Sequence, residues 1–242
     1  MSERGSNVST QRRFKAVLFD LYDTLIWLDT ERSVRDRRRL ATLAGVEFER
    51  FMSVWRRSVD DRMLGKGNGL AGHLSETLSE LGIDPSPDLV SELAEIEKRR
   101  LEECVHLYPS AVPVLTELRH RGYALGLVSN ISDGASVPIT HLGIDRFFDQ
   151  MILSHEVGLL KPDPAIFALA CQRMDSACEE TMFVADGGFG ELDASHQLDM
   201  FSVMVEQDYQ SKDYGASTTY DLKIHDLTEL LALLPARTSR DE

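Results

Sequence analysis

Three short apolar runs in the sequence end on side chains that can carry chemistry. Asp20 follows the first run, Ser129 and Asn130 end the second, and Asp186 follows the third. A carboxylate in such a place serves as a nucleophile, a metal ligand or a general base. The hydroxyl of Ser129 and the amide of Asn130 can donate hydrogen bonds to anionic oxygens. These residue types favour chemistry on an anionic group.

A further carboxylate and a lysine extend this set. Glu191 lies five residues after Asp186, and Lys161 lies in the segment GLLKPDPAIF. Mg²⁺ takes oxygen ligands, keeps several waters and is held by one or two carboxylates together with a substrate phosphate. Asp20, Asp186 and Glu191, with a backbone carbonyl, suit such an ion. A nucleophilic carboxylate, a metal, a hydroxyl and a lysine together describe phosphoryl transfer through an aspartyl-phosphate.

The elements that must position these residues alternate between strand and helix. The hydrophobic patterns predict strands at 16–19, 123–130, 150–154, 181–185, 200–205 and, more weakly, 217–222. They predict helices at 112–122, 164–174, 191–198 and 227–234. This alternation indicates an α/β fold with a Rossmann-like parallel sheet and helices on both faces. Ligands bind beyond the carboxyl ends of such strands, so residues 20–24, 129–130 and 186–188 are expected to converge.

A long helical segment interrupts this alternation after the first strand. From Thr30 to about Cys104, apolar residues recur at spacings of three and four, with breaks at Gly45, 65–69 and 84–87. We expect three or four helices that form a small α-helical cap domain. The predicted domains are a core of 14–28 and 105–235 and a cap of 29–104, with a disordered tail at 1–13 and a second tail at 236–242.

Charge and composition narrow the partners. The chain has 242 residues with 40 acidic and 26 basic side chains, and its formal charge is −14. Such a surface repels nucleic acids and anionic membranes, so we expect neither as a partner. The small anionic substrate that we expect follows from the chemistry of the residues above. No apolar run approaches the ~20 residues that span a bilayer, and the start lacks an apolar signal core. Three cysteines without a metal-binding or disulfide spacing fit a reduced, cytoplasmic location.

Four motifs, in this order along the chain, resemble those of the haloacid dehalogenase (HAD) superfamily of hydrolases. They are FDLYDTL at 19–25, LVSN at 127–130, LLKPDP at 159–164 and FVADGGFGELDAS at 183–195. The helical insert between the first two motifs is similar to one cap type of that family. The resemblance covers about residues 15–205 and implies a hydrolase with this core and cap.

The resemblance also implies roles for single residues. Asp20 matches the nucleophile that forms the covalent intermediate, and Ser129 matches the residue that hydrogen-bonds the transferred group. Lys161 matches the lysine that holds the nucleophile and neutralises charge. Asp186 matches the metal-binding aspartate, and Glu191 falls where its second acid usually lies. Thr24 matches the threonine that supports the loop of the first motif.

Tyr22 departs from the family's phosphatase pattern. That position usually holds an aspartate that protonates the leaving alcohol and then activates water. A phenol with a pKa near ~10 is a poor general base at neutral pH. General acid–base catalysis is worth ~10²–10⁴-fold, so a phosphatase without it should be slow or limited to good leaving groups. The backbone carbonyl of Tyr22 still suits a metal, and its ring is expected to line the substrate site with Asn130.

These residues leave three candidate functions, and Tyr22 is the residue that distinguishes them. Asp186 and Glu191 favour a Mg²⁺-dependent small-molecule phosphatase, because two acids at metal-ligand positions are costly if nothing neutralises them. A tyrosine at this position resembles the pattern of the family's 2-haloacid dehalogenases, which displace halide without a metal. The third function is a catalytically weak homologue that binds a ligand or a partner.

The arginines of the helical segment allow two interpretations. The run ERSVRDRRR at 31–39 is predicted as a solvated helix face in preference to a contact with an anionic substrate. The same interpretation is given to Arg56, Arg57, Arg62 and Lys66.

Overall fold

The core of the structure is a parallel sheet of six strands. The structure is a computed structural model, and it describes residues 13–207 and 217–237. The strand order is β5-β4-β1-β6-β7-β8, and every neighbouring pair is parallel. The strands are β1 (Ala16–Phe19), β4 (Ala124–Ser129), β5 (Gln150–Leu153), β6 (Thr181–Ala185), β7 (Phe201–Val205) and β8 (Leu222–Ile224). The predicted Rossmann-like α/β fold is confirmed.

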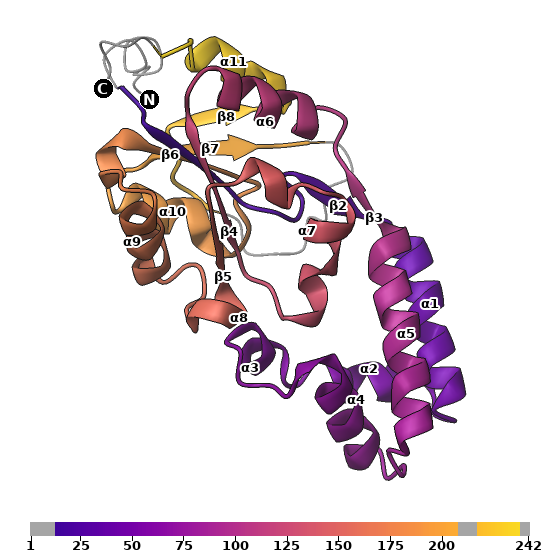
Figure 1. Cartoon of the computed structure of the whole chain (residues 1–242). Coiled ribbons are helices and arrows are strands. Elements are labelled where there is room, and N and C mark those ends of the chain that lie inside the picture. Colours follow the sequence, from indigo (N-terminus) through magenta and orange to yellow (C-terminus); the bar gives the residue numbers. More distant parts are fainter. Residues whose placement is uncertain (1–12, 208–216, 238–242) are drawn as a thin grey trace.

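Helices cover both faces of this sheet (Figure 1). Val17 and Phe19 of β1 pack with α6 (Ala111–His120), α7 (Val137–His141) and α11 (Leu230–Leu233). Ala16 and Leu18 point to the other face and pack with α9 (Pro164–Arg173) and α10 (Glu191–His196). Because successive side chains of a strand alternate between faces, a strand that is apolar throughout is buried on both sides.

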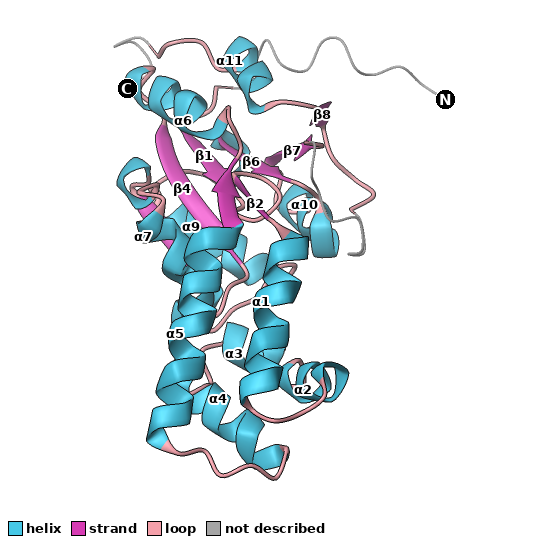
Figure 2. Cartoon of the chain, turned by 90° about the vertical axis from the view of Figure 1, so that its right-hand side faces the viewer, coloured by secondary structure: helices cyan, strands magenta, loops and turns pink. Residues whose placement is uncertain are grey.

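Five helices follow β1 where three or four were predicted. They are α1 (Thr30–Leu43), α2 (Phe48–Trp55), α3 (Val59–Met63), α4 (Gly69–Glu80) and α5 (Pro87–Cys104). Helices α1, α2, α4 and α5 surround an apolar cluster of their own that includes Phe51, Leu74 and Leu93. Figure 2 shows α1 and α5 side by side and running away from the sheet. We call residues 30–104 the helical segment; its status as a separate domain stays a prediction.

Local sequence explains where these helices begin. Asp29 precedes α1, and its side chain accepts a hydrogen bond from the backbone N–H of Arg32. Ser86 caps α5 in the same way, and Pro87 occupies its first turn. A side-chain oxygen at this position satisfies an N–H that has no partner within the helix, and proline loses nothing there.

A two-stranded ribbon, which was not predicted, joins the helical segment to the sheet. Strand β2 (Ile26–Leu28) pairs antiparallel with β3 (Val105–Leu107), and Ile26 lies opposite Leu107. The chain therefore leaves the core and returns to it through two hydrogen-bonded strands. Each strand has three residues, too few for an alternating pattern to stand out.

The remaining elements are short. Helix α8 (Ser154–Val157) follows β5, and 3₁₀ turns lie at Gly134–Ser136, Asp145–Phe147, Cys178–Glu180, Gly188–Gly190 and Leu227–Glu229. Strand β8 begins at Leu222, later than the predicted 217–222. The predicted tail at 1–13 lies outside the described residues except for Arg13, and so does 238–242 of the second tail. In the described ranges, no helix combines the length and apolar character needed to cross a membrane.

Candidate active site

The carboxyl ends of two adjacent strands and the start of a helix bring the predicted acids together. Asp20 follows β1, and Asp186 follows the neighbouring β6. Glu191 begins α10, which folds back beside β6. Asp20, Asp186 and Glu191 each offer one oxygen, and these oxygens lie within 4.8 Å of one another. We call these three residues the acid cluster.

Lys161 lies against the acid cluster. Its ammonium group contacts Oδ1 of Asp20 and lies 2.5 Å from Oε2 of Glu191. Its side chain is almost fully buried, as are those of both partners. A buried cation between two buried carboxylates stabilises both charges, whereas either carboxylate alone would be costly.

Asn130 holds the main chain of Lys161. Its Nδ2 donates to the carbonyl of Lys161 at 2.8 Å, and its Oδ1 accepts from the N–H of Lys161 at 2.8 Å. Both ends of the amide are therefore engaged. This pair ties the loop after β4 to the residue that reaches Asp20, which favours a positioning role for Asn130 in place of the substrate contact predicted from sequence.

The loop after β1 is held by its own hydrogen bonds. Thr24 is buried, and its hydroxyl donates to Oδ2 of Asp20 at 3.3 Å. The N–H of Leu25 donates to the carbonyl of Leu21 at 2.9 Å, and Asp23 adopts a left-handed conformation with φ of 58°. The turn presents the Asp20 carboxylate to Lys161, as the order of these residues in FDLYDTL predicts.

Ser129 ends β4 beside Asp20. It is buried, and in the part of the chain that the structure describes its hydroxyl has no hydrogen-bond partner. Its position at the strand end beside Asp20 lets its O–H donate to a bound anion.

The acid cluster has three carboxylates and, among the described residues, only one neighbouring cation, Lys161. Burial raises the pKa of Glu191 well above its ordinary value; Lys161 opposes this effect, and Asp20 and Asp186 add to it. Burial also raises the pKa of Asp186, and Asp20 adds to the increase. Burial alone lowers the pKa of Lys161, but Asp20 and Glu191 outweigh burial and raise it. One lysine thus serves three carboxylates.

The acid cluster fits a divalent cation by its donor set. Three carboxylates within 4.8 Å of one another offer hard oxygen ligands, and Lys161 neutralises only one of their charges. A cation would relieve the repulsion that raises the pKa values of Asp186 and Glu191. The site therefore fits Mg²⁺ better than it fits an empty state.

Tyr22 lies in the loop after β1, two residues after Asp20, and faces the helical segment. Its hydroxyl donates to the carbonyl of Ala135 at 3.5 Å. Burial raises its pKa to about 12, although the charge of Arg100 lowers it. A phenol with this pKa does not supply the base that the family's aspartate provides at neutral pH.

The predicted solvent exposure was wrong for two arginines of the helical segment. Arg37 and Arg62, predicted as solvated, are half-buried and line a cavity of about 190 Å³. We call this space the inner cavity. Arg57 is exposed as predicted and pairs with Glu80 on the surface. Arg37 had a signal: it shares a face of α1 with Ser33 and Leu40, both buried.

The comparisons with known proteins agree with this geometry. The model of the haloacid dehalogenase-like hydrolases matches residues 14–197. A glyceraldehyde 3-phosphate phosphatase from Methanopyrus kandleri is 29% identical over 196 residues, which covers 80% of this chain and 84% of the relative. A phosphoserine phosphatase from Thermus thermophilus is 33% identical over 159 residues, which covers 64% of this chain and 61% of the relative.

Solved structures share the fold. A 2-haloacid dehalogenase from Pseudomonas syringae superposes with a TM-score of 0.70 at 24% identity and covers 91% of this chain and 98% of its own. A HAD phosphatase from Thermococcus onnurineus gives 0.65 at 22% identity, with coverages of 93% and 99%. Four motifs in order, their meeting at one sheet edge and a family match over most of the chain lead to one conclusion: this protein belongs to the haloacid dehalogenase-like hydrolases.

Proposed function

We propose that the protein is a Mg²⁺-dependent phosphatase that hydrolyses small phosphate esters through an aspartyl-phosphate on Asp20. The observation that carries this proposal is the acid cluster, whose three carboxylates lie within 4.8 Å of one another around a single lysine. A metal-free displacement needs only the nucleophile and its cation and gives no reason for the two further acids. The relatives named glyceraldehyde 3-phosphate phosphatase and phosphoserine phosphatase support the same activity.

The residues divide the reaction between them. A carboxylate oxygen of Asp20 attacks phosphorus, the bond to the leaving alcohol breaks, and an acyl phosphate forms on Asp20. Lys161 and Thr24 orient that carboxylate, and Ser129 donates to an oxygen of the transferred group. Water then attacks the acyl phosphate, which returns Asp20 and releases inorganic phosphate.

Asp20, Asp186 and the backbone carbonyl of Tyr22 would hold Mg²⁺, with Glu191 as a ligand or as the acid that orients one. The ion supplies positive charge that offsets the charge of the transferred phosphoryl group. Lys161 contacts both Glu191, at 2.5 Å, and Asp20, so it holds these two acids together.

Tyr22 limits the substrates. The leaving oxygen needs a proton unless its own pKa is low, and a phenol with a pKa of about 12 is a weak source of one. We therefore infer a preference for esters of acidic alcohols, or a slow enzyme.

The helical segment completes the site in this proposal. We propose that residues 29–104 act as a cap domain on the core of 14–28 and 105–235, with Tyr22 at their boundary. The acidic net charge of −14 supports a small anionic substrate over a nucleic acid. A cytoplasmic location is part of the same proposal.

Fluoroberyllate tests the nucleophile directly. This ion mimics a phosphoryl group on a carboxylate, so with Mg²⁺ it should raise the melting temperature of the wild type. Asp20→Asn should lose that rise and all turnover, whereas Asp175→Asn, on the exposed surface before β6, should keep both. More than about a tenth of wild-type turnover in Asp20→Asn would place the nucleophile elsewhere.

A metal-free 2-haloacid dehalogenase is the second candidate, and Tyr22 is the observation that favours it. A dehalogenase needs no proton donor for its leaving halide, so a tyrosine there carries no cost. Release of chloride from 2-chloropropionate in EDTA distinguishes this candidate from the phosphatase.

A further inference from the structure

The inner cavity is lined by both parts of the molecule, and four of its five charged lining residues are arginines. The helical segment provides four arginines and one glutamate to it, and the loop after β4 provides Ser132, Gly134 and Ala135. The arginines are Arg37, Arg56, Arg62 and Arg100, and the glutamate is Glu97. This concentration of positive charge occurs in a chain with a formal charge of −14. A basic hollow in an acidic protein attracts a small anion selectively.

Arg62 is held in place but keeps donors free. Its Nη2 donates to the carbonyl of Trp55 at 3.4 Å, and its guanidinium carbon lies 5.2 Å from the centre of the Trp55 ring. Its Nε is buried and has no partner, and within residues 13–207 and 217–237 it forms no ion pair with a carboxylate. Burial lowers the pKa of Arg62, and the charge of Arg37 lowers it further. An anion would relieve both effects.

Arg37, in α1, is in a similar state. Its Nη2 reaches Oε1 of Glu97 at 3.3 Å, and its Nε is buried without a partner. Glu97 is already committed to Arg100, which donates to it at 2.8 and 2.6 Å. One carboxylate thus serves two arginines, and Arg62 has none. A held guanidinium group whose charge no carboxylate fully matches binds an oxyanion at little cost in entropy.

The inner cavity adjoins the loops that carry the chemistry. Ala135 lines it, and the carbonyl of Ala135 accepts the hydroxyl of Tyr22, two residues after Asp20. Ser132 lines it three residues after Ser129. The charges of Arg100, Glu97 and Arg37 all act on Tyr22, so the loop that carries the nucleophile lies within electrostatic range of these arginines.

Contact between the two parts of the molecule holds Arg62 over this loop. Helix α3, which carries Arg62, contacts α8. Gly65 follows α3, and a Cβ added there would come within 2.1 Å of the carbonyl oxygen of His155 in α8. The backbone approach that only glycine allows therefore brings α3 to the core.

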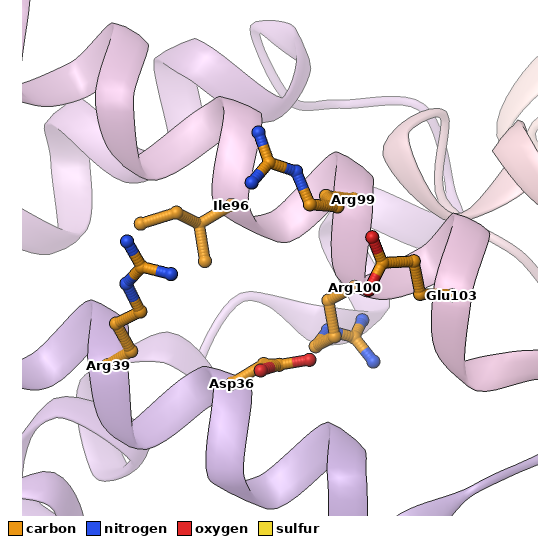
Figure 3. A pocket seen from close by; sticks show the side chains of 6 residues that line it. All are labelled: Asp36, Arg39, Ile96, Arg99, Arg100 and Glu103. Atoms are coloured by element: carbon orange, nitrogen blue, oxygen red, sulfur yellow. The ribbon is translucent and has the colours of Figure 1, made fainter.

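A second hollow lacks this relation to the core. It lies between α1 and α5, has a volume of about 180 Å³ and is lined only by residues of these two helices (Figure 3). Figure 3 shows Asp36 and Arg39 of α1 facing Arg99 and Glu103 of α5. None of its lining residues comes from the sheet or its loops. An anion there would be remote from the strand ends, so we assign it no role.

We propose that the inner cavity binds a second anionic group of the substrate, a carboxylate or a phosphate, through Arg62 and Arg37. This inference rests on the proposed function and narrows it to phosphate esters that carry a second oxyanion. A cavity of about 190 Å³ holds such a group with a few carbons, since one water needs only about 10–15 Å³ of it. Arg56, at the exposed rim, adds attraction at a distance.

Non-hydrolysable phosphonates test this proposal by binding alone. The probes are 3-phosphonopropionate, propane-1,3-bisphosphonate and propylphosphonate, which share a three-carbon chain and differ in the second anion. Calorimetric titration with Mg²⁺ compares the wild type, Arg62→Gln, Arg62→Lys and the surface control Arg57→Gln. A hydrogen bond to a charged group corresponds to about 10- to 100-fold in affinity.

We expect the wild type and Arg57→Gln to bind one of the two-anion probes at least about tenfold more tightly than propylphosphonate. Arg62→Gln should lose most of this preference, and Arg62→Lys should keep part of it because it retains the charge without the fork. The probe that is preferred identifies the second anion as carboxylate or phosphate.

Equal affinity for the three probes, no binding of any of them, or a preference unchanged in a folded Arg62→Gln would overturn the proposal. If Arg62→Gln does not fold, the test passes to Arg37→Gln and Arg62→Lys, and a preference that is unchanged in both overturns the proposal. Failure of the proposed function appears separately, as a wild type that hydrolyses no phosphate ester whatever it binds.

Discussion

Neutralising Asp186 should stabilise the protein in the absence of metal and remove most of its stabilisation by magnesium. The acid cluster places three carboxylates near one ammonium group. Two like charges at about 4.8 Å repel by about 3–4 kcal/mol at an effective dielectric constant of about 20. Asp186→Asn removes two such repulsions, with Asp20 and Glu191, and loses one attraction to Lys161.

The expected gain without metal is about 1–3 kcal/mol, because partial protonation already relieves some of the repulsion. For a chain of this size each kcal/mol shifts the melting temperature by about 2–4 °C. The variant should therefore melt several degrees above the wild type in EDTA. Mg²⁺ at about 100 times its dissociation constant should stabilise the wild type by about 2.7 kcal/mol and the variant far less.

Thermal melts of both proteins in EDTA and in Mg²⁺ measure this directly. Asp175→Asn is the matched control, because it removes the same charge from an exposed position outside the acid cluster. The control should respond to Mg²⁺ as the wild type does. The reasoning fails if the wild type melts at the same temperature in Mg²⁺ and EDTA, or if Asp186→Asn keeps the full response.

Three further perturbations test other parts of the structure. Gly65→Ala places a Cβ against the backbone of α8, whereas Gly45 has a similar φ and no atom near the position of an added Cβ. Only Gly65→Ala should therefore lower kcat/KM, by about tenfold or more. Equal losses in the two variants would contradict the close approach of α3 to α8. Tyr22→Asp should raise hydrolysis of alkyl phosphates by about tenfold or more, with a ceiling of ~10²–10⁴-fold, and lower any dehalogenation; an active phosphatase that does not change would show that this residue is not limiting. Glu97→Gln should cost about 3–5 kcal/mol in urea unfolding because it strands two buried arginines, whereas Glu80→Gln on the surface should cost about 0–1; similar costs would contradict the burial.

The strand ends were predictable because their signals are local. A short apolar run followed by Asp20 or Asp186 identifies both a buried strand and the edge where ligands bind. The structure brings Lys161 to Asp20 although they are 141 positions apart. Sequence alone placed Lys161 there only through the resemblance, because hydrophobic patterns do not specify contacts between distant loops.

The arginines show the opposite case. Glu97 and Arg100 lie on the face of α5 that also carries Leu93 and Leu101, so helical periodicity marks them as buried. Periodicity does not reveal that Arg37 of α1 meets them, since this depends on how α1 and α5 pack. The contact of Asn130 with Lys161 was not predicted for a related reason: its partner is the main chain of Lys161, which has no sequence signature.

The ribbon of β2 and β3 was missed because each strand is only three residues long. Its pairing joins positions on either side of the helical segment, about 80 residues apart, and no local pattern specifies such a pair. The predicted boundaries at Thr30 and Cys104 nevertheless match the start of α1 and the end of α5, because the change from strand to helix periodicity is strong there.

Substrate turnover with and without metal tests the central claim most directly. The purified protein is given an aryl phosphate, an alkyl phosphate and 2-chloropropionate, each with Mg²⁺ and with EDTA, and the release of phosphate and chloride is measured. Asp20→Asn is the negative control for both reactions. We predict phosphate release that requires Mg²⁺, is faster with the aryl ester and is absent from Asp20→Asn, with no chloride released. Chloride release in EDTA without any phosphate release would contradict the assignment and identify a dehalogenase.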